Sequence, residues 1–167
     1  MVLLVAGLAT IGCDHVTKHA AMTMLAGRPS QSYLGDIVRL AYAENTGGFL
    51  SLGASLPAST RIAVFTVGTG LVLLVLAVLM FRRQVELGQF PRSSALGLTL
   101  FVAGGASNWL DRALRGGSVV DFLNVGVGTV RTGIFNIADM AIMAGALLLL
   151  MNEVRHLLER QPAPRSY

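Results

Sequence analysis

Two aspartates in otherwise apolar surroundings are the residues of this sequence best placed to do chemistry. Asp121 directly follows Val119 and Val120, and Asp139 lies in the stretch from Ile134 to Met151. When two carboxyl groups approach within a few ångströms they do not both ionise readily, so the pair shares a proton. One carboxylate then takes a proton from attacking water while the protonated partner stabilises the oxyanion. The pair predicts peptide hydrolysis of the aspartic-protease kind, with no cofactor and no metal.

Each aspartate also has a structural interpretation. Asp121 is compatible with an ordinary acid of a surface loop. A structural Asp139 would be expected to have Lys or Arg four residues further on, where this chain has Met143. With a helix that begins near Ile134, Asp139 is expected about five residues, or roughly 7.5 Å, inside the helix.

The elements that position these residues are predicted to be membrane helices. The chain has 167 residues, of which 53% are hydrophobic and only 13% charged, whereas soluble domains average about 25% charged residues. Four stretches have, or nearly have, the length and apolar character of a membrane span: Met1 to about Met24, Ile62 to Phe81, Ser93 to Leu110, and Ile134 to Met151. The sequence predicts a single integral membrane domain, residues 1–167, with four transmembrane helices.

A strand is predicted between the first two spans. In Ile37 to Glu44, apolar Val38, Leu40 and Tyr42 occupy every second position. The short connection from Arg82 to Arg92 has more arginines than acids, so the positive-inside rule places it in the cytoplasm. Both termini are then cytoplasmic, including a tail, Gln161 to Tyr167, expected to be unstructured, and the polar residues of three spans meet at the external face. Several arginines in the other connections weaken this bias.

Three sets of polar residues share helical faces in the predicted spans. They are Asp14, Thr17 and Lys18; Asn108, Asp111 and Arg112; and Asn136 with Asp139. Ionisable groups in a span cost a few kcal/mol on insertion scales, so they normally face a protein interior and mark function.

Part of this polarity has a structural interpretation. Asp14 and Lys18 are spaced to form an (i, i+4) ion pair that neutralises both charges. Asp111 and Arg112 are adjacent and do not face one another, so two separate interfacial contacts are the alternative for them. Arg112 carries a rigid fork of donors suited to peptide carbonyls.

Several other functions are disfavoured. The formal charge is +4, but no Lys/Arg-rich run is present, so no nucleic acid partner is expected. His15 and His19 have metal-ligand spacing without further ligands nearby, and no metal site is predicted. A secretory signal ending at Cys13 is an alternative for the N-terminus, but it lacks a positively charged n-region. A small transporter or proton channel is the alternative from another class, although the spans are polar only at one end.

Five motifs of the sequence resemble one family, the bacterial lipoprotein signal peptidases, or signal peptidase II. They are Asp14-His15-Val16-Thr17-Lys18, Asn45-Thr46-Gly47-Gly48, Asn108-Trp109-Leu110-Asp111-Arg112, Val119-Val120-Asp121-Phe122 and Phe135-Asn136-Ile137-Ala138-Asp139. They follow the family's order and cover residues 14–139.

The resemblance implies an inner-membrane enzyme with four spans and a small extracytoplasmic β-sheet that forms a cradle. Its substrate would be a diacylglyceryl-modified prolipoprotein, cleaved immediately before the lipidated Cys, and its partners that substrate and membrane lipid. We expect a monomer. The resemblance assigns catalysis to Asp121 and Asp139, and substrate binding to Asn45, Gly47, Asn108, Arg112 and Asn136. Asp14, Lys18 and Asp111 would support the site.

The sequence departs from the family pattern at a few positions. Ser107 replaces the Gly that usually precedes Asn108, and Phe49 follows Gly48 where the family has Ala. These departures motivate one alternative, a paralogue with a narrowed or dedicated lipoprotein substrate.

Overall fold

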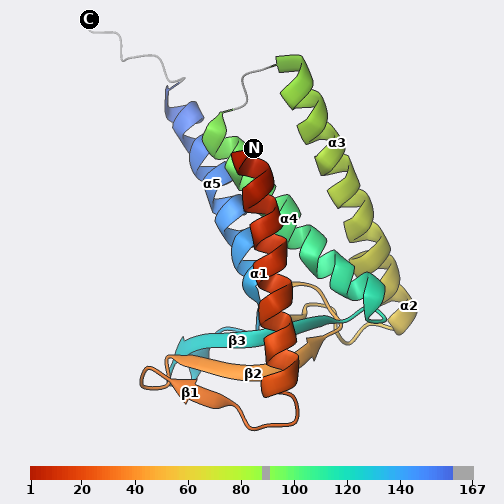
Figure 1. The fold of residues 1–167 in the computed structure, drawn as a ribbon, viewed down its shortest axis with the longest axis vertical. Coiled ribbons are helices and arrows are strands. Elements are labelled where there is room, and N and C mark those ends of the chain that lie inside the picture. Colours follow the sequence, from red (N-terminus) through yellow and green to blue (C-terminus); the bar gives the residue numbers. More distant parts are fainter. Residues whose placement is uncertain (88–90, 160–167) are drawn as a thin grey trace, which may run out of the picture.

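Four long helices run along the molecule, and a small sheet covers one end of them (Figure 1). The structure is a computed structural model that describes residues 1–87 and 91–159. The long helices are α1 (Val2–Met24), α3 (Thr69–Leu87), α4 (Arg92–Leu114) and α5 (Ile137–Glu159). The beginning of α1 and the end of α5 lie at the end opposite the sheet (Figure 1). The predicted unstructured tail and residues 88–90 of the basic connection lie outside the described residues.

Helix α4 is the centre of the bundle, because α1, α3 and α5 all pack on it. Small residues let α4 and α5 approach closely. A Cβ atom added at Gly104 would lie 2.5 Å from the carbonyl oxygen of Ala138, and one at Gly97 would lie 3.0 Å from that of Gly145. Close backbone contact through small residues is how membrane helices gain packing energy, since lipid tails are as apolar as leucine.

The outer surface of the bundle is apolar and its interior contains charged groups. On α3, Leu71 and Leu74 are each more than half exposed, whereas Asp14 and Lys18 of α1 are buried. This distribution suits a lipid environment. By length and composition, Ala58–Arg82, with a mean hydropathy of 2.7, and Ile137–Glu159, with 1.7, qualify as membrane spans.

The second predicted span is not one regular helix. It starts as α2 (Ala58–Arg61), widens into a π-helical segment, η2 (Ile62–Gly68), and continues as α3. A π-helical turn shifts backbone hydrogen bonds out of register, and such turns occur frequently at functional sites. The indole Nε1 of Trp109 donates to the carbonyl oxygen of Thr66 at 2.9 Å, so a side chain of α4 pairs with this segment. Gly70 makes room for that indole, because a Cβ there would lie 2.6 Å from Nε1.

The sheet is antiparallel with the strand order β1-β2-β3-β4. Its strands are β1 (Gln31–Tyr33), β2 (Val38–Asn45), β3 (Val119–Val127) and β4 (Val130–Arg131). The strand predicted at Ile37 to Glu44 is therefore confirmed, displaced by one residue. A mostly helical fold with a small sheet is what the sequence predicted.

Candidate active site

A β-bulge in β2 decides which face of the sheet carries Asn45. The register pairs Leu40 with Leu123 but Ala43 with Asp121, so β2 has one extra residue between the two pairs. A one-residue shift moves every later side chain to the other face of a sheet. Beyond the bulge, Asn45 therefore shares a face with Asp121, and its Nδ2 donates to Asp121 Oδ2 at 2.9 Å.

A backbone bridge brings the start of α5 to the same place. Phe135 pairs with Leu123 of β3, two residues after Asp121, through reciprocal backbone hydrogen bonds of 2.8 Å. The next residue, Asn136, is completely buried, and its Nδ2 donates to Asp121 Oδ1 at 2.6 Å. Residues far apart in the sequence are thus held together by the sheet.

Asn136 and Asp139 form a reciprocal cap at the start of α5. The side-chain oxygen of Asn136 accepts the backbone N–H of Asp139 at 2.9 Å, and Asp139 Oδ2 accepts the backbone N–H of Asn136 at 3.2 Å. This is the arrangement of a capping box. The predicted depth of Asp139 is wrong for this reason: the extended bridge at Phe135 and the cap make the helix begin at Ile137, so Asp139 is its third residue.

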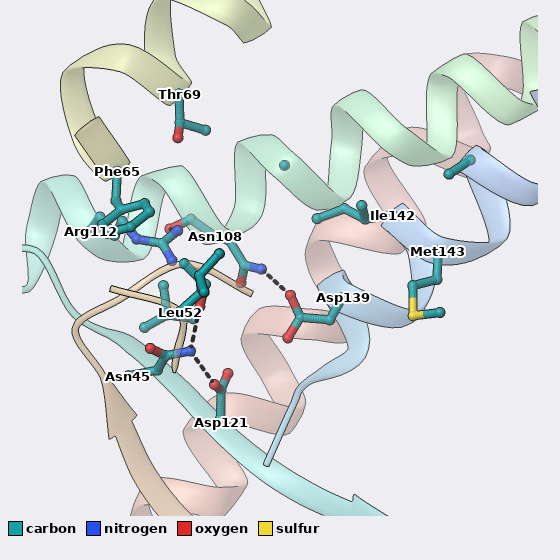
Figure 2. A pocket seen from close by; sticks show the side chains of 14 residues that line it. Asn45, Leu52, Phe65, Thr69, Asn108, Arg112, Asp121, Asp139, Ile142 and Met143 are labelled. Atoms are coloured by element: carbon teal, nitrogen blue, oxygen red, sulfur yellow. Dashed lines mark hydrogen bonds between the residues drawn. The ribbon is translucent and has the colours of Figure 1, made fainter. Parts of the chain in front are cut away.

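Asp121 and Asp139 both line a cavity of about 380 Å³ (Figure 2). Asp121 is 1% exposed and Asp139 7% exposed. Asp139 Oδ1 also accepts Nδ2 of Asn108 at 2.9 Å, so all four carboxylate oxygens of the pair receive an N–H donor. In the described part of the chain, neither aspartate forms an ion pair.

Burial raises the pKa of Asp121 to about 6, and the charge of Asp139 acts in the same direction. The hydrogen bonds from Asn45 and Asn136 lower the pKa of Asp121 but do not cancel the cost of desolvating its charge. A carboxyl group with this pKa can hold a proton close to neutral pH, as an acid of a proton-sharing pair must.

Arg112 lines the same cavity with part of its donor fork unused. Its Nη2 donates to the carbonyl oxygen of Gly47 at 2.8 Å, and the side chain is buried. Its buried Nε has no hydrogen-bond partner among the described residues. A buried unpaired donor is costly, so this atom is suited to a carbonyl oxygen that enters with a ligand. Asp111 pairs with Lys18 and Arg115 and not with Arg112, so the two adjacent residues make separate contacts, as their spacing predicted.

The loop after β2, which includes the short helix η1 (Phe49–Ser51), holds Arg112 through its backbone. A Cβ atom at Gly47 would lie 2.5 Å from the carbonyl oxygen of Leu52, so the loop folds back tightly there. Gly47 itself does not line the cavity, whereas Gly48 and Asn45 do. Asn136 is likewise absent from the lining, and it donates a hydrogen bond to each of the two carboxylates.

Sequence reasoning missed the apolar wall of the cavity. Besides Leu52, it consists of side chains from η2, α3 and α5, namely Phe65, Thr69, Ile142, Met143 and Ala146. In the sequence these residues look like any others in an apolar span. The cavity therefore combines a polar end with a long apolar side.

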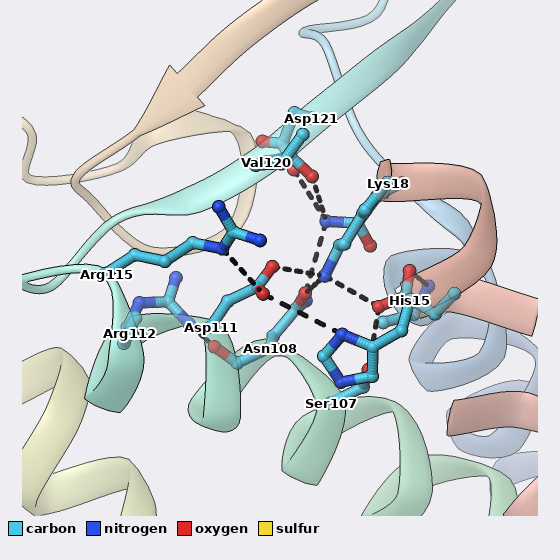
Figure 3. Close-up of polar contacts among 12 residues, drawn as sticks. His15, Lys18, Ser107, Asn108, Asp111, Arg112, Arg115, Val120 and Asp121 are labelled. Carbon is cyan, nitrogen blue, oxygen red and sulfur yellow. Dashed lines mark hydrogen bonds and ion pairs between the residues drawn. The ribbon is translucent and has the colours of Figure 1, made fainter. Parts of the chain in front are cut away.

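A second group of charges, around Lys18 and Asp111, lies next to Asn108 (Figure 3), which also contacts Asp139. Lys18 is 1% exposed, and its Nζ lies 2.6 Å from Asp14 Oδ2 and 2.9 Å from Asp111 Oδ2. The predicted (i, i+4) pair of Asp14 and Lys18 is confirmed. We call Asp14, Lys18 and Asp111 the charged cluster.

Asp14 connects three helices. Its Oδ1 accepts the backbone N–H of Ala138 in the first turn of α5 at 2.9 Å, and its Oδ2 accepts the hydroxyl of Ser107 at 2.7 Å. Carboxylates at a helix N-terminus satisfy free N–H groups and favour the helix dipole. Ser107 is fully buried and does not line the cavity, so its hydroxyl serves packing between α1 and α4.

Comparisons with known proteins agree with this geometry. The family described as Signal peptidase (SPase) II matches residues 6–155. The chain belongs to the signal peptidase II family. Relatives named lipoprotein signal peptidase include those of Sphingopyxis alaskensis, 37% identical over 82% of this chain and 76% of that protein, and Chlorobium phaeobacteroides, 32% identical over 83% and 81%. This membership favours a peptidase over the transporter alternative.

Two solved structures share the fold, and both are described as bacterial membrane enzymes. One superimposes with a TM-score of 0.81 at 21% identity, covering 99% of this chain and 94% of the other. The second has a TM-score of 0.74 at 23% identity, covering 91% and 92%. The fold of this signal peptidase II family member is thus that of a bacterial membrane enzyme.

Proposed function

We propose that the protein removes the signal peptide from diacylglyceryl-modified prolipoproteins with Asp121 and Asp139 as its catalytic pair. Membership of the signal peptidase II family makes it a membrane peptidase that processes lipoprotein precursors. The observation that carries the assignment is the pair itself: two buried carboxylates from different elements, without an ion pair among the described residues, both hydrogen-bonded to Asn136 and both lining one cavity.

The chemistry follows from two buried carboxyl groups that share one proton. In the proposed scheme Asp121 holds this proton and Asp139 is the base. Water attacks the carbonyl carbon of the scissile peptide, one water proton passes to Asp139, and the proton of Asp121 passes to the carbonyl oxygen. Collapse of the tetrahedral intermediate then breaks the C–N bond, and a proton returned from the pair neutralises the leaving amine.

Substrate is held by groups on both sides of the pair. The free Nε of Arg112 binds a backbone carbonyl of the signal peptide, and Asn45 and Asn108 keep the carboxylates in place. We assign Asn136 to holding both carboxylates, because it is fully buried and outside the cavity lining. Gly47 contributes its carbonyl oxygen as the support of Arg112.

The membrane arrangement is also part of the proposal. We infer that α1 and α4, each of 23 residues, cross the bilayer with the other two long helices, since about 20 residues suffice. Both termini then lie in the cytoplasm, and the sheet and carboxylate pair lie near the external surface, at the depth where a lipid-anchored Cys holds its peptide bond. The whole chain acts as one monomeric domain among membrane lipids.

The test is cleavage of a diacylglyceryl-modified precursor by the purified protein in detergent, followed by a gel shift. We expect cleavage by the parent and a loss of at least about 10³-fold in Asp121→Asn and in Asp139→Asn. Asp36→Asn is the matched control and keeps full activity, because Asp36 lies in the turn between β1 and β2 and does not line the cavity. More than a few per cent residual turnover in either variant removes that residue from the pair.

A further inference from the structure

Asn108 stands between the charged cluster and the carboxylate pair, and it contacts both. Its Oδ1 accepts from Lys18 Nζ at 2.8 Å, while its Nδ2 donates to Asp139 Oδ1 at 2.9 Å. The two ends of an asparagine amide have nearly the same shape, so its partners decide which end points where. An ammonium group has three donors and no acceptor, so only the oxygen of the Asn108 amide can form a hydrogen bond with Lys18. The amide nitrogen must then face Asp139.

We propose that Lys18 is a positioning residue of the peptidase, which fixes the orientation of Asn108 so that Asp139 always receives an N–H. With the amide reversed, its oxygen would face a carboxylate oxygen, an arrangement that requires a proton on Asp139. A protonated Asp139 does not accept the proton of the attacking water. The inference rests on the proposed function, since it assigns Lys18 a role in that reaction beyond support of the fold.

Lys18 is held rigidly enough for this role. Its ammonium forms ion pairs with Asp14 Oδ2 at 2.6 Å and Asp111 Oδ2 at 2.9 Å, and it donates a hydrogen bond to Asn108 Oδ1 at 2.8 Å. The two carboxylates come from α1 and α4, so the ammonium position is set by the packing of both helices. Lys18 therefore couples helix packing to the orientation of one amide.

The other donor to Asn108 is less able to orient it. Asn136 Nδ2 reaches Asn108 Oδ1 only at 3.2 Å. The same NH₂ group also lies 2.6 Å from Asp121 Oδ1 and 3.3 Å from the carbonyl oxygen of Val120, so its two hydrogens face three acceptors. When Lys18 is removed, no strong donor remains on the oxygen of Asn108.

A purely electrostatic effect of Lys18 on the carboxylate pair is the competing explanation. Lys18→Met and Lys18→Gln separate the two, because both remove the positive charge and have similar length, and only glutamine donates an N–H to Asn108. We measure kcat and KM on the diacylglyceryl-modified precursor for both. We expect kcat of Lys18→Gln to exceed that of Lys18→Met by about tenfold to a hundredfold, with KM unchanged within about twofold.

Lys18→Met and Lys18→Gln are also compared in an Asn108→Ala background, where the difference in kcat between them should vanish. If Lys18→Met does not fold, both Lys18 variants are made in an Asp14→Asn/Asp111→Asn background, which leaves no uncompensated carboxylate in the charged cluster. Equal kcat values for Met and Gln, in whichever background folds, overturn the proposal. Cleavage by the parent and its loss in Asp139→Asn report on the proposed function separately, so failure of the orientation role leaves that function intact.

Discussion

The molecule contains two pairs of buried aspartates on opposite sides of Asn108, and their surroundings differ. In the charged cluster, Asp14 and Asp111 share the ammonium of Lys18 and do not line the cavity of the carboxylate pair. Asp121 and Asp139 are almost as buried, but amides are their partners, and one side of each faces a cavity. Both regions contain the same residue type at similar burial.

The difference teaches how the surroundings divide structure from chemistry. A buried carboxylate with a cation keeps its charge and ties helices together, whereas a pair without a cation must share a proton. The cavity gives water access to that proton. Burial by itself therefore does not distinguish the proposed catalytic pair; the absence of an ion pair to either of its carboxylates, within the described residues, does.

The largest effect on stability is expected from breaking the charged cluster. Lys18→Met should lower the free energy of unfolding by about 3–5 kcal/mol, because it leaves buried Asp14 without a counterion and buried Asp111 with only Arg115. Unfolding in mixed detergent micelles measures this. Arg39→Met is the control, since Arg39 pairs with Asp36 at the surface and should change stability far less. Equal losses in both variants would remove the distinction between the cluster and a surface pair.

The carboxylate pair should destabilise the folded state when it ionises, in contrast to the charged cluster. The pKa of Asp121 is raised from 3.8 to about 6, so the folded state binds a proton more tightly than the unfolded state. Stability therefore falls as the pH rises from about 4 to about 6, by about 3 kcal/mol, and the loss persists above that range. Asp121→Asn should remove this contribution to the slope.

The matched control for that slope is Asp36→Asn. Hydrogen bonds from Arg39 and Ser32 hold the pKa of Asp36 well below its usual range, so its contribution is present above pH 4 and is lost only in stronger acid. The slope between pH 4 and 6 should remain in this variant. A slope that also survives in Asp121→Asn would show that another group is responsible.

A smaller effect, on catalysis, is expected from changing Arg112, which lines the cavity with the carboxylate pair. Arg112→Lys keeps the charge but loses the planar fork that reaches Gly47 and leaves Nε free. We expect kcat/KM for the lipidated precursor to fall about tenfold to a hundredfold, mostly through KM. Arg115 bonds Asp111 and does not line the cavity, so Arg115→Lys should change kcat/KM by less than about twofold. Equal losses in both would assign Arg112 to the cluster.

The smallest effect concerns Ser107. Removing its hydroxyl in Ser107→Ala deletes one hydrogen bond to Asp14 and should cost about 1 kcal/mol of stability. Because Ser107 does not line the cavity, the ratio of kcat/KM values for two different precursors should not change. A changed ratio would support the narrowed-substrate alternative that this position motivated.

The sequence by itself determined the membrane character, the strand at β2 and the polar helical faces with the two candidate aspartates, whereas Asn45 and Gly47 were implied only by the family resemblance. Local information suffices for these, because helical spacing and apolar runs are properties of neighbouring residues. The (i, i+4) pair of Asp14 and Lys18 was predictable for the same reason. The depth of Asp139 was not, because the cap formed with Asn136 depends on where β3 holds Phe135.

Only the tertiary structure decided which buried aspartates have a cation. Lys18 is one helical turn from Asp14, but its distance from Asp111 depends on how α1 packs against α4. Likewise, a one-residue bulge in β2 sets whether Asn45 faces Asp121. Contacts of this kind depend on register and packing between distant segments, and no spacing within a single segment encodes them.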